Sequence, residues 1–166
     1  MPGVRAWRLA SLAVVIALGP LGACAVTGLN FVEDDRIDLV APGDRDEVRL
    51  PVGVQWTADD GLADEIGSYA VLIDRAPPPP GRSVAWLFRD DDACANRVGC
   101  PDAQYLADRG VYVTSETSIV VERIPRLASE GRHDLHEATV ILLDRQAERI
   151  GESAWSVEFE LVDGRS

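Results

Sequence analysis

Apolar and polar residues alternate through most of the chain after residue 35, and this pattern predicts β-strands. The last such segment, Trp155–Leu161, places a large apolar residue at every odd position and Ser or Glu between them. A period of two is typical of a strand with one buried face, whereas helical spacing would scatter the same residues around the axis. The run Val48–Thr57 alternates in the same way. Pro51 within it indicates an edge or a bulge, because proline has no amide proton to donate.

Shorter alternating segments predict the remaining strands, and turn-forming residues separate them. These segments are residues 36–40, 68–74, 83–88, 111–114, 118–122 and 137–144. Together with the two longer runs they give seven or eight short strands. The pattern therefore predicts an all-β domain built as a β-sandwich.

The segment Arg89–Gly110 interrupts the strand pattern. It is longer than an ordinary hairpin connection, and long loops are often functional or locally stapled. Within it, Asp102 is suited to cap a helix of one or two turns over residues 103–109, which would end at the glycine. We therefore expect a long connection with one short helix.

The first residues have a different composition from the rest of the chain. Arg5 and Arg8 precede the apolar run Leu9–Leu18, which Gly19-Pro20 ends. A positive segment followed by a short apolar segment is the order of a secretory signal. The apolar run is about half as long as a bilayer-spanning helix requires, so we expect a signal peptide and not a membrane span.

The sequence Leu21-Gly-Ala-Cys24 follows this run directly and resembles the bacterial lipobox. The resemblance implies that Cys24 carries acyl chains such as palmitate and that the chain is cut just before it. It predicts a signal peptide over 1–23, a lipid-anchored tether over 24–35 and the sandwich domain over 36–166. Each buried methylene of an acyl chain contributes about 0.8 kcal/mol, so two or three chains would anchor an exported protein that faces the periplasm or the cell surface. The alternative is an ordinary signal peptide with a chance cysteine.

Three features of residues 36–162 resemble the immunoglobulin-like and fibronectin type III sandwiches. An early strand ends in Trp56, the next opens with Tyr69, and Leu127 is followed six residues later by His133. In the fibronectin family a tyrosine commonly occupies that last corner, where this chain has the histidine. No cysteine pair is placed to join the predicted sheets, so the chain differs from antibody domains.

Charge and missing motifs exclude several function classes. After the predicted cleavage, 14 arginines face 28 acidic residues, and the net charge of −14 repels polyanions such as nucleic acids. The chain has no lysine, which excludes a P-loop lysine and a Schiff-base lysine. It also lacks Gly-x-Ser-x-Gly, His-Glu-x-x-His and a glycine-rich phosphate loop. The sequence therefore predicts neither an enzyme nor a bound cofactor.

Cys94 and Cys100 remain as an even pair once Cys24 is committed to lipid. In an oxidising compartment such a pair is predicted to form a disulfide. The alternative counts both cysteines with His133 and His136 as zinc ligands. Their Cys-x5-Cys and His-x2-His gaps differ from the usual zinc spacings, so we predict no metal site here.

Acidic clusters support a second alternative, a divalent-cation-binding or enzyme-accessory domain, because calcium binds carboxylate and carbonyl oxygens. The clusters are Asp34-Asp35, Asp59-Asp60 with Asp64-Glu65, and Asp90–Asp92. None matches an EF-hand loop, and solvated loop charge explains them more simply. The last cluster, beside the predicted disulfide, is the remaining candidate for calcium or a basic partner.

The leading hypothesis is a non-catalytic binding or scaffolding module that presents residues 89–110 to an envelope protein or polysaccharide. The candidate binding residues are Trp86, Phe88, Asp90, Asp91, Asp92, Arg97, Gln104, Tyr105 and Arg109. The competing interpretation is that the segment only covers the sandwich, so that Tyr105 and Leu106 point into the core. A purely structural envelope lipoprotein is the third alternative.

Overall fold

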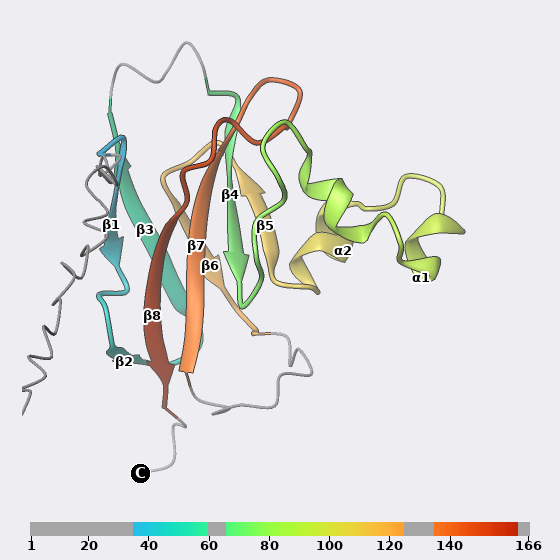
Figure 1. Cartoon of the computed structure of the whole chain (residues 1–166). Helices are drawn as coiled ribbons and strands as arrows, with labels where there is room; N and C mark the ends of the chain where they lie inside the picture. Colours follow the sequence, from blue (N-terminus) through green and yellow to red (C-terminus); the bar gives the residue numbers. More distant parts are fainter. Residues whose placement is uncertain (1–34, 60–65, 125–134, 163–166) are drawn as a thin grey trace, which may run out of the picture. The chain divides into compact units, whose positions relative to one another are not determined.

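The computed structural model describes residues 35–59, 66–124 and 135–162. These residues form eight β-strands in two sheets, with one 3-10 helix and two short α-helices (Figure 1). The prediction of an all-β domain with seven or eight strands is confirmed. The predicted signal peptide, Cys24 and the corner residue His133 lie outside the described residues. No helix in the described ranges is both long enough and apolar enough to cross a membrane.

The smaller sheet has three antiparallel strands in the order β1-β3-β6. Their bounds are Ile37–Ala41 for β1, Val52–Ala58 for β3 and Ser118–Val121 for β6. Val52, Val54 and Trp56 alternate on the buried face of β3, as the sequence predicts.

The larger sheet has five strands in the order β2-β8-β7-β4-β5. Their bounds are Asp46–Val48 for β2, Ser68–Ile73 for β4, Val111–Thr114 for β5, Leu135–Leu143 for β7 and Trp155–Leu161 for β8. β2 runs parallel to β8, and the other pairs are antiparallel. The predicted strand over residues 48–57 is thus divided at Pro51, because the chain there leaves the five-stranded sheet and enters the three-stranded one.

The main hydrophobic core lies between the two sheets. Trp56 from the three-stranded sheet meets Tyr69 from the five-stranded sheet edge to face, with ring centroids 5.3 Å apart. Val71 and Phe159 are fully buried in the same cluster. Edge-to-face aromatic pairs contribute about 0.5–1.5 kcal/mol beyond their buried area, so this pair helps to fix how the sheets face each other.

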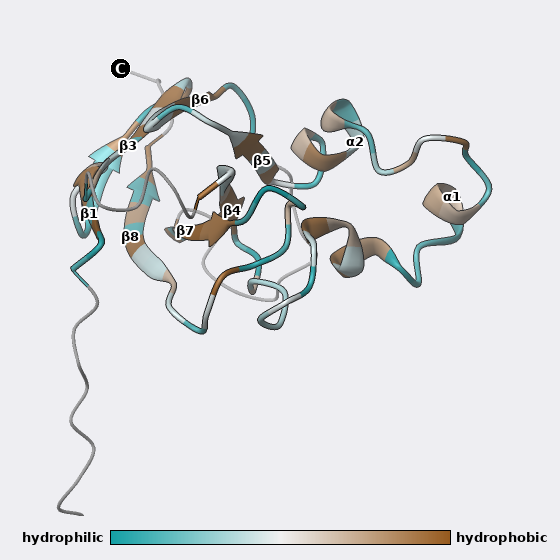
Figure 2. Ribbon diagram, turned by 90° about the horizontal axis from the view of Figure 1, so that it is seen from above, coloured by the Kyte–Doolittle hydropathy of each residue, from teal (hydrophilic) through white to brown (hydrophobic). Residues whose placement is uncertain are grey.

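The two central strands of the five-stranded sheet are buried on both faces. Alternate residues of β4 and β7 enter the main core, while Ala70, Leu72, Ile141 and Leu143 enter a second cluster on the opposite face. The β4–β5 connection, residues 74–110, supplies most of the other members, and Val111 of β5 is also buried there. Figure 2 shows the three layers in succession: the three-stranded sheet, the five-stranded sheet and the connection.

The strand predicted over residues 83–88 is wrong, because Val84–Phe88 is a 3-10 helix. Val84 and Phe88 at its two ends are buried, whereas the three residues between them are only partly buried. The alternation of this segment fits a strand equally well, and only the packing distinguishes the two. Trp86, between them, is only partly buried.

A buried arginine holds the proline segment that precedes this helix. The Arg149 guanidinium donates hydrogen bonds to the backbone oxygens of Pro78 at 2.7 Å, Glu152 at 2.5 Å and Ser153 at 3.2 Å. Burial lowers the pKa of Arg149. The start of the β4–β5 connection is therefore held against the β7–β8 turn, and from there it continues over the outer face of the five-stranded sheet.

Candidate functional site

The candidate site is built on the β4–β5 connection, whose inner surface belongs to the protein core. Val84, Phe88, Cys94, Tyr105 and Leu106 all contribute buried side chains to the second cluster. Two of the predicted binding residues, Phe88 and Tyr105, are only 5% and 4% exposed. Their rings pack edge to face with centroids 5.5 Å apart, so these rings cover the sheet and expose little surface to a ligand.

Two capped helices shape the connection. The Asp91 carboxylate accepts a hydrogen bond from the Ala93 amide at 3.0 Å at the start of α1, Asp92–Ala95. The Asp102 carboxylate accepts one from the Tyr105 amide at 2.8 Å at the start of α2, Ala103–Ala107. The predicted helix cap at Asp102 is confirmed. These local bonds satisfy amides that a helix start leaves without partners.

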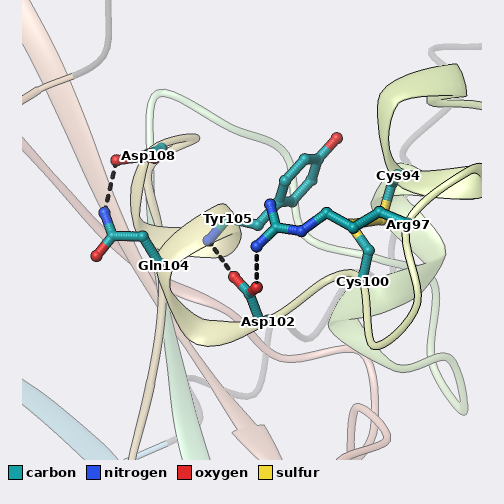
Figure 3. Close-up of polar contacts among 7 residues, drawn as sticks. All are labelled: Cys94, Arg97, Cys100, Asp102, Gln104, Tyr105 and Asp108. Atoms are coloured by element: carbon teal, nitrogen blue, oxygen red, sulfur yellow. Dashed lines mark hydrogen bonds and ion pairs between the residues drawn. A yellow bond between two sulfur atoms is a disulfide. The ribbon is translucent and has the colours of Figure 1, made fainter.

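The Cys94–Cys100 disulfide joins α1 to the segment just before the α2 cap, Asp102, with Cα atoms 5.3 Å apart (Figure 3). The predicted disulfide is present in the structure. Arg97 inside this loop pairs with Asp102, which holds the loop a second time. We call residues 94–100 the stapled loop.

The stapled loop carries a fully exposed valine. Val98 stands next to Gly99, whose φ of +78° turns the chain back toward the second cysteine. An apolar side chain held in water by a constrained loop contributes nothing to the core. The sequence analysis did not identify Val98 as a candidate, although an apolar residue between two paired cysteines is a signal for an exposed loop tip.

Asp91, Tyr105 and Arg109 form a network at the base of the stapled loop. The Tyr105 hydroxyl donates to the Asp91 carboxylate, and Nε of Arg109 lies 3.4 Å from Asp91 Oδ2. The Arg109 guanidinium also lies 3.5 Å from the Tyr105 ring centroid. The hydrogen bond from Tyr105 is the largest cause that lowers the pKa of Asp91. Burial, followed by the bond to Asp91, raises the pKa of Tyr105.

This network borders an open hollow of about 550 Å³. The hollow is lined by Arg75, Leu87, Phe88, Asp90, Asp91, Asp92 and Arg109. Five of the predicted candidates therefore meet at one place. Arg75, which follows β4, was not among them, because 34 residues separate it in the sequence from Arg109.

A second hollow, of about 590 Å³, lies beside α2 between the edge strands β5 and β6. Gln104 lies here, where its side-chain amide donates to Asp108 at 2.9 Å, and Arg123 donates to the same carboxylate at 3.0 Å. Figure 3 shows Gln104 directed to Asp108, away from the stapled loop. Gln104 is therefore separated from the other candidates.

Trp86 lies at the rim of the connection, partly buried. The Arg89 guanidinium covers its ring at 3.7 Å from the centroid and pairs with Asp90 at 3.0 Å. The aromatic face on that side is thus already occupied by a cation of the same chain.

The metal alternatives find no support in the described ranges. These residues contain no group of three or more His, Cys, Asp or Glu side chains placed to hold a metal ion. Cys94 and Cys100 are joined to each other, and Nδ1 of His136 lies 2.7 Å from Asp74. His133 and most of the other acidic clusters lie outside the described residues.

Comparison with known proteins adds no family to this description. The chain matches no protein-family model. It matches no solved structure either.

Proposed function

We propose that this protein is an exported lipoprotein, anchored through Cys24, whose immunoglobulin-like sandwich is a non-catalytic binding or scaffolding module. The order β1-β3-β6 in one sheet and β8-β7-β4 in the other supports that fold. It corresponds to strands A-B-E and G-F-C of the immunoglobulin fold. β5 then takes the position beside C that variable-type domains give to an added strand.

The recognition element in this proposal is residues 89–110, and the stapled loop is its tip. One observation carries the proposal: the inner side of the connection is core, while its outer end holds Val98 fully in water on a disulfide-closed loop. Fixing a loop before binding reduces the conformational entropy that association costs. An apolar side chain exposed on a disulfide-closed loop can enter a partner's pocket with little loss of conformational freedom.

The partner that fits best is a protein of the cell envelope. A polysaccharide would stack sugar rings on open aromatic faces. The rings nearest the stapled loop are buried, as in Phe88 and Tyr105, or covered by a guanidinium, as in Trp86. An apolar tip surrounded by charged residues is instead typical of a protein interface with a polar rim.

The recognition element can be tested by photo-crosslinking in the native cell. A photoreactive residue at Val98 is expected to give a discrete adduct with an envelope protein. The matched control is Val40, which is 52% exposed on β1 of the other sheet. Equal adducts from both positions, or none from position 98, would refute the assignment.

The lipid anchor has its own test. Cys24→Ser is expected to give a product that no longer partitions into detergent and whose intact mass lacks acyl chains. An unmodified Cys24 at the N-terminus of the membrane-bound wild-type protein would contradict the proposal.

A further inference from the structure

Arg75 is a half-buried cation that has no acidic partner among the described residues. Its Nε donates to the Arg109 backbone oxygen at 3.3 Å, and its guanidinium lies 5.1 Å from the Phe88 ring centroid. Both contacts stabilise the guanidinium, but neither supplies a negative charge. The mature chain has two acidic residues for every arginine, so the lack of a partner does not reflect a shortage of carboxylates.

The other charged groups of the hollow are either already paired or open to water. Asp91 accepts from Tyr105 and lies against Arg109, while Asp90 pairs with Arg89. Asp92 is exposed, and an exposed charge is solvated without a partner. Arg75, in contrast, has lost part of its hydration through burial and has gained no acidic partner among the described residues. A bound anion would replace that lost hydration.

Two guanidinium groups share this hollow. Burial lowers the pKa of Arg75, and the charge of Arg109 lowers it further, which places the two cations within electrostatic reach. The Arg75 guanidinium stays charged at neutral pH. Arg109 already lies against Asp91, so the uncompensated charge is that of Arg75. An anion bound at Arg75 would offset this charge and accept two parallel hydrogen bonds from the planar fork of its guanidinium.

We infer that Arg75, assisted by Arg109, is a receptor for a single carboxylate group. A singly charged carboxylate is favoured over phosphate because Asp90–Asp92 border the same hollow and repel a doubly charged group more strongly. This inference rests on the proposed function: the carboxylate belongs to an aspartate or glutamate of the protein partner that docks beside the stapled loop.

The test is a titration of the mature lipid-anchored protein in neutral detergent micelles, followed by arginine Nε–Hε NMR signals. Sodium acetate is the probe, with sodium chloride at equal ionic strength as the reference. Acetate is expected to shift the Arg75 and Arg109 signals and to saturate them, while chloride is not. Saturation by phosphate at a lower concentration than acetate would overturn the assignment to a carboxylate, and so would equal responses to acetate and chloride.

Variants separate the site from a general effect of charge. Arg75→Gln is expected to weaken acetate binding about tenfold, the loss of one charge-assisted pair. Arg82→Gln removes an exposed arginine near the proline segment and should leave binding unchanged. Arg75→Lys keeps the charge and the apolar stem but not the fork, so an intermediate affinity is expected. Undiminished binding in Arg75→Gln, or an equal loss in Arg82→Gln, would overturn the inference.

This experiment is independent of the partner. Acetate saturation without an adduct at position 98 would uphold the carboxylate site and refute the stapled loop as recognition element. An adduct at position 98 without acetate saturation would uphold the stapled loop as recognition element and refute the carboxylate site.

Discussion

Phe88→Ala tests whether the β4–β5 connection is part of the core. Phe88 is 5% exposed and contacts the Tyr105 ring edge to face, beneath the Arg75 guanidinium. Truncation of a buried phenylalanine to alanine costs about 3–5 kcal/mol. For a domain of this size, where 1 kcal/mol corresponds to about 4 °C, Tm should fall by about 12–20 °C.

The assay is thermal unfolding, together with urea denaturation to check that the m-value is unchanged. Phe159→Ala, in the main core between the sheets, is the comparison and should cost a similar amount. Val98→Ala, at the exposed tip, should leave Tm within about 2 °C, as surface substitutions usually do. A fall of less than about 3 °C for Phe88→Ala would mean that the connection is a dispensable cover, and our assignment of the second cluster would be wrong.

Two further predictions concern the same connection. Replacing Cys94 and Cys100 together with alanine opens a short loop and should lower the free energy of unfolding by about 2 kcal/mol through chain entropy. The variant should then have the same free energy of unfolding as the reduced wild-type protein. A lower value than that of the reduced wild type would show that the cysteines stabilise the fold in another way as well. Tyr105→Phe removes the donor that lowers the pKa of Asp91. Since the folded-state pKa lies below the unfolded value, this stabilisation is complete above about pH 4 and is lost as the pH falls through the folded pKa. The stability difference between wild type and Tyr105→Phe should therefore narrow on acidification, and a difference that widens in urea titrations below pH 4 would contradict it.

The strands could be predicted from the sequence because burial on alternate faces is a local property. β8 shows this directly: Val157 and Phe159 are buried, whereas Ser156 is exposed and Glu158 is only partly buried. The strand predicted at 83–88 is wrong because apolar residues at 84 and 88 fit one face of a strand, but they also fit a short 3-10 helix that buries its two ends. Nothing within that segment tells which surface will receive it.

The site could be predicted only in part. Asp91, Asp92 and Arg109 were identified because they surround a stapled loop in the sequence. The sequence could not show whether Phe88 and Tyr105 pack in the core or bind a ligand. That choice depends on whether the outer face of the five-stranded sheet is covered, which only the structure shows. Arg75 was not identified because its relation to Arg109 depends on the pairing of β4 with β5.

The double burial of β4 and β7 has a consequence for the solubility of the chain. Tyr69–Ile73 and Ala138–Leu143 are uninterrupted buried runs, uncharged and free of proline, and segments of this kind aggregate when exposed. In the folded domain both strands are flanked by hydrogen-bonded neighbours on each side, so neither presents an open edge. Their outer face is shielded by the β4–β5 connection, which therefore protects the sheet from self-association as well as presenting the stapled loop. Substitutions on the inner surface of the connection are therefore expected to promote aggregation as well as to lower stability, whereas substitutions on its outward surface are not.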